Sequence, residues 1–438
     1  MSTSQAPTVT AAQGQRNEWL LVSFTATTNI ADGVIKVALP LLAVRMSHSP
    51  IVITTVAAAL SLPWLIAALH VGVFVDRLNR RTLMIGAETV RMLSVAVLLA
   101  TFLSHTLTLP LIYAMAFVLG VAEVVALVSA ASIVPSAVPR RHWQRASARI
   151  TGMEYLCNGF LGAPVGGFLV AAGFGLALIS TGSIYIVGAI LLALLAGNFA
   201  VRSTTARRAV HEEIKDGLGF LWQHRLLRTM ALLITVMAGC WAAWLALIPV
   251  YAVGGPLQLT ARQYGLLLAC LGAGGVAGSA VVGPVNRLLG RRWSMFVDIV
   301  GSFVLVGLPA VLPAKPAAAW AIGLAAFVAG AGGTMWTVNS RVITQSFVPQ
   351  ELLGRFSAAS RLVSWGMQPV AAATAGALAL VSYRLAFGAF AVLCLGLVYP
   401  FLKVVTSAAI APADEPEPAD SALAATPDRE LSVTEPTT

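Results

Sequence analysis

The chain has 438 residues, of which 58% are hydrophobic and only 11% are charged. A soluble protein of this length would carry a larger share of charged residues. The composition therefore predicts an all-α polytopic membrane protein. A net charge of +10 would suggest nucleic-acid binding in a soluble protein, but here the basic residues lie in short loops between apolar runs. Membrane topology explains them better, and we expect no nucleic-acid partner.

The apolar runs predict twelve transmembrane helices, because about 20 helical residues cross the roughly 30 Å hydrocarbon core. In chain order the predicted spans are 19–44, 51–75, 82–104, 109–134, 150–172, 176–201, 229–252, 263–285, 293–312, 318–347, 362–382 and 385–405. These define two six-helix bundles, 19–201 and 229–405, joined by a linker with an amphipathic helix at 202–228. The polar tails, 1–18 and the acidic, Pro-rich 406–438, are predicted to be disordered.

The distribution of arginine and lysine predicts the orientation. Nineteen of them fall in the N-terminal tail and the loops of one side, against Arg45, Arg262, Lys315 and Arg384 on the other. Since basic residues in short loops mark the cytoplasmic side, we expect both termini to lie in the cytoplasm. The expected location is the plasma or inner membrane of the cell.

Features typical of enzymes and metal proteins are missing from the sequence. The four cysteines stand singly in apolar runs, which indicates packing and not disulfides or metal ligands. The glycines of 272–278 resemble a dinucleotide loop in letters only, because they lie inside an apolar span, and there is no P-loop. We expect no enzyme activity, cofactor or metal.

A charged loop, Gly72-Val-Phe-Val-Asp76-Arg77-Leu-Asn-Arg80-Arg81, separates the second and third spans. Its pattern, GxxxDRxxRR, resembles the corresponding loop of the major facilitator superfamily. That resemblance implies a charge network that latches the two halves of the protein on the cytoplasmic side. The gate residues that it implies are Gly72, Asp76, Arg77, Arg80, Arg81, Arg145 and Arg355. The alternative is a plain basic loop that only sets topology.

The two halves of the chain match at a constant offset of 210 residues. Glu88 falls on Asp298 and Arg145 falls on Arg355, and the match continues over about 95 residues. The chain is therefore predicted to be a duplicated six-helix unit, with two pseudo-symmetric halves as in the major facilitator fold. Such halves suit alternating access around a site near the bilayer midplane.

Several segments resemble the drug-efflux branch of that superfamily, which includes macrolide exporters and siderophore exporters of the enterobactin type. They are Asn29-Ile-Ala-Asp32-Gly33, Leu62-Pro63-Trp64-Leu65, Gly120-Val-Ala-Glu123 and the segment from Asn158 to Gly167. Antiporters of neighbouring branches carry an arginine in helix four, whereas this span has Glu123 and no arginine. A proton mechanism copied from those relatives therefore does not transfer directly.

Ionisable residues inside the spans are the candidates for coupling and binding. Asp32 and Lys36, four residues apart, are expected to pair on one helix face, with mere mutual neutralisation as the alternative. Glu123 has no partner in sequence, and an apolar setting favours its neutral form, so it is the leading proton site. The alternative is a buried carboxylate that is hydrogen-bonded to a neighbouring helix.

Two further sets of ionisable residues are weaker candidates. Glu154, on one face with Asn158, is a second proton candidate or a cytoplasmic gate residue. Glu88 and Arg91, three residues apart, are expected to form a structural pair.

The family fold implies that helices one, four, seven and ten line the substrate cavity. The cavity candidates are Asp32, Lys36, Glu123, Asn158, Trp241, Trp244, Trp336 and Asn339. An acidic wall opposite an aromatic wall suits an amphipathic or cationic organic molecule. The alternative is that the tryptophans face lipid or pack in the core.

These observations together predict a multi-pass secondary transporter. We expect it to work as a monomer in the lipid bilayer and to export a small amphipathic compound (a drug, an antibiotic, a siderophore or a toxic metabolite), with protons as the coupling ion. A metabolite importer or uniporter is the alternative within transport. A membrane sensor or receptor on a transporter fold is the alternative of another class.

Overall fold

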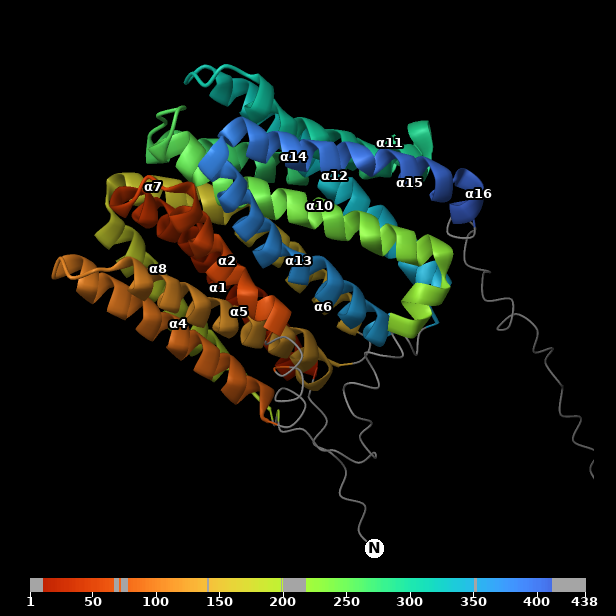
Figure 1. Cartoon of the computed structure of the whole chain (residues 1–438). Coiled ribbons are helices and arrows are strands. Elements are labelled where there is room, and N and C mark those ends of the chain that lie inside the picture. Colours follow the sequence, from red (N-terminus) through yellow and green to blue (C-terminus); the bar gives the residue numbers. More distant parts are fainter. Residues whose placement is uncertain are drawn as a thin grey trace, which may run out of the picture.

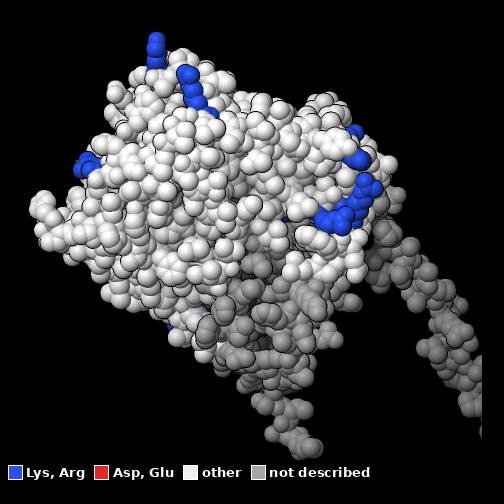
Figure 2. Space-filling view, in the orientation of Figure 1, with Lys and Arg blue, Asp and Glu red and all other residues white. Residues whose placement is uncertain are grey.

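The computed structural model describes residues 11–66, 71, 78–139, 142–197, 199, 218–349 and 353–411. Every regular element in these ranges is a helix, and nine of the helices are long and apolar enough to cross a membrane. The helices lie roughly parallel in one bundle (Figure 1). On the face drawn in Figure 2, the basic side chains of the described residues gather toward the two ends of the bundle and leave the band between them uncharged. The all-α polytopic membrane architecture is confirmed.

The first half of the chain contributes helices that correspond to the first six predicted spans. They are α1 (Ala11–Met46), α2 (Pro50–Ile66), α4 (Arg80–Leu103), α5 (Leu109–Ala137), the continuous run of α6 (Trp143–Glu154), the π-helix η2 (Tyr155–Gly162) and α7 (Ala163–Ala172), and α8 (Phe174–Ala193).

The second half contributes the helices of the remaining predicted spans. They are α10 (Arg225–Pro249) with the π-helix η3 (Val250–Gly254), α11 (Ala261–Val311), α12 (Ala318–Phe347), α13 (Leu353–Val381), and the pair α14 (Tyr383–Gly396) and α15 (Val398–Val404). A short helix, α16 (Ser407–Ile410), follows them.

The 51-residue helix α11 covers two predicted spans. It bends at Gly290, whose φ of 81° lies in the left-handed region that glycine adopts without steric cost. The bend separates the predicted spans 263–285 and 293–312, so the described helices are consistent with twelve crossings.

The first helix begins earlier than predicted. We expected disorder up to residue 18, but α1 starts at Ala11 because its first turns are fixed to the bundle. The Asn17 side chain donates hydrogen bonds to the carbonyls of Ala137 and Ala196, and Glu18 pairs with Arg149 at 2.7 Å. Likewise α16 lies in the predicted C-terminal tail. Most of the predicted linker, 202–217, lies outside the described residues, and residues 218–223 are helical.

Glycines allow the helices to pack at very short distances. A Cβ added at Gly274 of α11 would overlap the carbonyl group of Phe327 on α12, and one added at Gly330 of α12 would overlap that of Leu271. Close backbone approach of this kind is typical of helix pairs in membranes. Small residues allow it, and the resulting van der Waals packing holds the helices together in place of the hydrophobic effect.

The two halves of the chain contact each other mainly through α2 with α13 and through α7 with α11. Gly167 of α7 and Gly265 of α11 face each other so closely that a Cβ on either would overlap the other's backbone. Gly376 of α13 lies against Thr54 of α2. These contacts lie near the ends of the helices that are predicted to face away from the cytoplasm, so they close that end of the interface.

We predict that Gly274→Ala will lower the thermal stability of the purified protein, because the added methyl group forces α11 and α12 apart, at a cost of about 1–3 kcal/mol for overpacking. The measurement is the unfolding temperature in detergent. Gly283→Ala, on the same helix with open space around its Cα, is the matched control and should leave the temperature within about one degree. Equal unfolding temperatures for the two variants would contradict the predicted packing.

Candidate functional site

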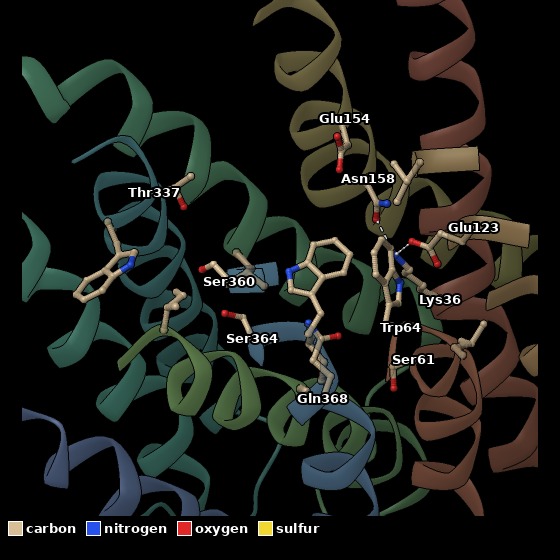
Figure 3. A pocket seen from close by; sticks show the side chains of 18 of the residues that line it. Lys36, Ser61, Trp64, Glu123, Glu154, Asn158, Thr337, Ser360, Ser364 and Gln368 are labelled. Carbon is tan, nitrogen blue, oxygen red and sulfur yellow. Dashed lines mark hydrogen bonds and ion pairs between the residues drawn. The ribbon is translucent and has the colours of Figure 1, made fainter. Parts of the chain in front are cut away.

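A cavity of about 780 Å³ lies between the two halves of the chain. It is lined by α1, α2, α5 and the α6–α7 run from the first half and by α10, α11, α12 and α13 from the second (Figure 3). On the second half it extends to Leu227 near the start of α10, Gln345 near the end of α12 and Phe356 near the start of α13. These helix ends adjoin loops that are predicted to be cytoplasmic. From these helix ends the cavity runs inward to Tyr264 and Ala372, close to the glycine contacts of the closed end.

A lysine and a glutamate form an ion pair on the cavity wall. Lys36 Nζ of α1 lies 3.0 Å from Glu123 Oε1 of α5, and the amide oxygen of Asn158 lies 3.4 Å from the same ammonium group (Figure 3). The Lys36 side chain is 41% exposed, although every other residue from Ala31 to Val44 is buried. This exposure comes from the cavity, so the ammonium group can be hydrated in the middle of a buried helix. Glu123, 10% exposed, is reached from the same space.

The expected pair of Asp32 with Lys36 is wrong. Asp32 turns to α4, where Arg91 lies 3.2 Å from its carboxylate, and the Tyr185 hydroxyl of α8 donates to it at 2.8 Å. Helical spacing placed Asp32 and Lys36 on one face, but each finds a closer partner on a neighbouring helix. Asp32 consequently does not line the cavity, and Glu123, which has no partner in sequence, has one in space.

The predicted pair of Glu88 and Arg91 is confirmed, at 2.8 Å, and belongs to a larger network. The Thr28 hydroxyl donates to Glu88 at 3.0 Å and accepts from Arg91 at 2.7 Å, while Arg91 also pairs with Asp32. The Arg91 side chain is only 1% exposed. One arginine thus balances two carboxylates in the interior of the first half, away from the cavity.

Asp298, which the 210-residue offset matches to Glu88, has a different environment. It is buried, and its carboxylate accepts a hydrogen bond from Ser302 at 3.3 Å. Among the described residues it forms no ion pair, since the position that matches Arg91 is Gly301. The two halves share their helices but not their buried charges.

Only one of the three predicted cavity tryptophans lines the cavity. Trp336 does, whereas Trp244 is fully buried in the main hydrophobic core and Trp241 donates its indole N–H to Ser302 at 2.8 Å. Asn339 is also buried, and it exchanges hydrogen bonds with Asn286 of α11. The expectation of an aromatic wall from helix seven is wrong, because Trp244 is packed in the core and Trp241 bonds to Ser302 of α11.

The predicted gate residues are only partly described. Gly72, Asp76 and Arg77 lie outside the described residues, as does the side chain of Arg355. Within the described part, the arginines bind helix ends of the first half: Arg80 donates to the carbonyl of Ser132, Arg81 to those of Leu192 and Ala193, and Arg145 lies 4.0 Å from Glu18. Cationic groups near the C-terminal ends of α5 and α8 favour those helix ends electrostatically.

Sequence reasoning missed the contribution of α2 and α13 to the cavity. Trp64 of α2 and Trp365 of α13 make an edge-to-face contact with ring centroids 4.2 Å apart, and both line the cavity. Ser360, Ser364 and Gln368 of α13 line it as well (Figure 3). Their spacing of four residues inside an apolar span was a signal that could have found them.

Two further charged residues, Glu154 and Arg341, line the cavity. Glu154 lines it near Asn158 (Figure 3). Arg341 of α12 is a further charged lining residue. Within the described ranges no cluster of His, Cys, Asp or Glu has the arrangement of a metal site, and all four cysteines are free thiols. The cavity thus combines apolar walls, an ion pair and scattered hydroxyl and amide groups.

Comparisons with known proteins agree with this architecture. Residues 21–259 match the family model of the Major Facilitator Superfamily. The Multidrug efflux pump Tap of Mycolicibacterium fortuitum is 26% identical over 377 residues, which covers 83% of this chain and 90% of that protein. The predicted family resemblance is confirmed.

Solved structures show the same fold at low sequence identity. A variant of the nucleoside transporter NupG superposes with a TM-score of 0.68 at 10% identity, covering 89% of this chain and 100% of its own. A bacterial homologue of the iron transporter ferroportin, in an inward-facing state, gives 0.65 at 14% identity, covering 90% and 99%. At these identities the likeness concerns the fold alone.

We predict that Arg91→Ala will destabilise the protein by about 3–5 kcal/mol, because it leaves the carboxylates of Glu88 and Asp32 buried without a counter-ion. The measurement is thermal or denaturant unfolding of the purified protein. Arg341→Ala, which removes an exposed arginine outside this network, serves as the control. If the two variants unfold alike, the buried network does not have the structural role assigned to it.

Proposed function

This chain belongs to the major facilitator superfamily, and we propose that it exports small amphipathic compounds across the cell membrane in exchange for protons. The chain is a multi-pass membrane transporter, and alternating access around the interface of its two halves is the mechanism that this architecture supports. The observation that carries the proposal is the cavity between the halves, with the Lys36–Glu123 pair on its wall.

The proposed direction of transport rests on the resemblance to efflux pumps, and the position of the cavity is compatible with it. The cavity reaches the helix ends beside the loops rich in arginine, and those loops are predicted to be cytoplasmic. An exporter loads its substrate in a state open to the cytoplasm, and an importer releases its substrate in the same state, so the cavity alone does not set the direction. The resemblance to proteins that bear the name Multidrug efflux pump supports export. An importer or uniporter has no comparable support.

The lining of the cavity supports an amphipathic substrate. Apolar side chains such as Leu268, Leu271 and Ile234 make up much of the wall, and Trp64 and Trp336 add aromatic surface. Pockets for organic molecules generally combine such walls with a few polar groups that fix orientation. The charges of Lys36 and Glu123 cancel each other, so the pair does not restrict the cavity to anions or to cations.

Glu123 is the proposed site of proton coupling. Its carboxylate is reached from the cavity, and its counter-ion, Lys36, is on another helix. Protonation of Glu123 removes the attraction that joins α1 to α5 and frees the ammonium group of Lys36. Deprotonation restores the pair. A proton that crosses a 100 mV potential supplies about 2.3 kcal/mol, which supports roughly a 50-fold substrate gradient.

Glu154 and Asp32 are weaker proton candidates. Asp32 is sealed in the network with Arg91 and does not line the cavity. Glu154 faces the cavity, but the ion pair on the cavity wall joins Lys36 to Glu123. Glu123 is favoured because it lines the cavity and its ion pair joins two helices.

We predict that Glu123→Gln will abolish substrate-induced proton flux, reducing it at least tenfold, because glutamine cannot exchange a proton. The measurement uses inverted membrane vesicles with an imposed pH gradient and records its dissipation when a panel of cationic and neutral drugs is added. Glu154→Gln is the matched control and should retain most of the flux. Unchanged flux in Glu123→Gln would move the coupling site elsewhere.

A further inference from the structure

Three polar side chains form a row along the cavity face of α13. Ser360, Ser364 and Gln368 are spaced four residues apart, so neighbouring members lie about 6 Å apart along the helix axis. Figure 3 shows all three side chains beside the open space of the cavity, on the side away from Lys36 and Glu123. We call these three residues the α13 polar row.

The α13 polar row differs from many hydroxyl groups of the membrane-spanning helices. Hydroxyls such as those of Thr235, Thr181 and Thr374 donate to the carbonyl four residues earlier in their own helix. Among the described residues, the side chains of the row make no hydrogen bond to protein. They keep their hydrogen-bonding capacity for whatever occupies the cavity.

The energetic argument is that polar groups at membrane depth need a partner. An unsatisfied hydroxyl or amide costs about 1–3 kcal/mol in protein interiors, and more in hydrocarbon. The row therefore depends on water or on a bound molecule. A molecule that presents oxygen or nitrogen atoms at a matching spacing replaces the water without losing hydrogen bonds.

An aromatic surface lies directly beside the row. Trp365 adjoins Ser364 in sequence and contacts Trp64 of α2 edge to face, and Ser61 lies one turn before Trp64 on the cavity wall. A flat apolar face of a ligand can pack against the rings while its polar edge meets the row. Because α2 and α13 come from different halves, such a ligand touches both halves at once.

We propose that the α13 polar row, with the Trp64–Trp365 pair, is a subsite that selects oxygen-rich aromatic molecules. The preferred ligand has a rigid fused-ring body and several hydroxyl or carbonyl groups along one edge. This inference rests on the proposed export function and narrows its substrate class. Lipophilic ions without hydrogen-bonding groups enter the same cavity but gain nothing from the row.

The test compares two aromatic cations. Doxorubicin has a fused-ring body with hydroxyl and carbonyl groups on its edges, whereas tetraphenylphosphonium has no hydrogen-bond donor or acceptor. Binding of each is measured by equilibrium methods on the full-length protein in lipid nanodiscs. The variant is the triple substitution Ser360→Ala, Ser364→Ala and Gln368→Leu. Thr374→Ala on the same helix is the control, because its hydroxyl bonds to Val370 within α13.

We expect the triple variant to lose at least tenfold in affinity for doxorubicin while tetraphenylphosphonium binding stays within twofold, and the control to match the wild type for both. Single substitutions, each expected to weaken doxorubicin binding about two- to tenfold, give the same test if the triple variant does not fold.

Three results would overturn the inference, and they separate it from the export proposal. Equal losses for both probes would mean that α13 matters only for general packing. If the wild-type protein binds tetraphenylphosphonium but not doxorubicin, the cavity accepts amphipathic ions and does not recognise oxygen-rich edges. That result leaves the export proposal intact. Binding of neither probe by a folded wild-type protein would count against the proposed substrate class as a whole, and against the subsite with it.

Discussion

The hydrocarbon core of a membrane does not tolerate a charge that lacks both a counter-ion and water, and this constraint organises the charged groups of the structure. Two charged residues of α1, about one helical turn apart, meet this constraint in different ways. Asp32 is sealed with Arg91 and Glu88, where close ion pairs and hydrogen bonds replace water. Lys36 faces the cavity, where water and Glu123 share its charge. One helix therefore carries both a fixed ionic network and an accessible ion pair.

This separation gives the two groups different mechanical roles. The buried network joins α1, α4 and α8 through Asp32, Arg91 and Tyr185, and it stabilises the first half as a rigid unit. The Lys36–Glu123 pair is reached from the cavity, so its protonation or its ligands can change without unfolding the core. The second half contains no matching network among its described residues, since its buried Asp298 bonds only to Ser302. The ion pairs among the described residues thus lie in the first half, while the second half contributes apolar wall, hydroxyl groups and Arg341 to the cavity.

Much of the fold could be predicted from the sequence because long apolar runs and basic loops report directly on membrane topology. The Glu88–Arg91 pair was predictable from local helix geometry, since residues three apart along a helix have neighbouring side chains. The partners of Asp32 and Lys36 were not predictable, because these partners lie on α4 and α5. The periodicity of one helix does not show which neighbouring helix each of its faces contacts. The tryptophans of α10 show the same limit. Apolar spans are hydrophobic on all sides, so their sequence does not fix which face turns toward the cavity.

The central claim is that the two halves work by alternating access, so that the glycine-rich contacts, which close one end of the interface here, separate when the open end closes. It is tested most directly by double electron–electron resonance on spin labels at Thr82 and Ser346, for the end that the cavity reaches, and at Thr106 and Lys315, for the closed end, in a cysteine-free background. Our account predicts that adding substrate at varied pH shortens the first distance in part of the population while lengthening the second. Distances that stay fixed, or that change in the same direction at both ends, would contradict alternating access about this interface.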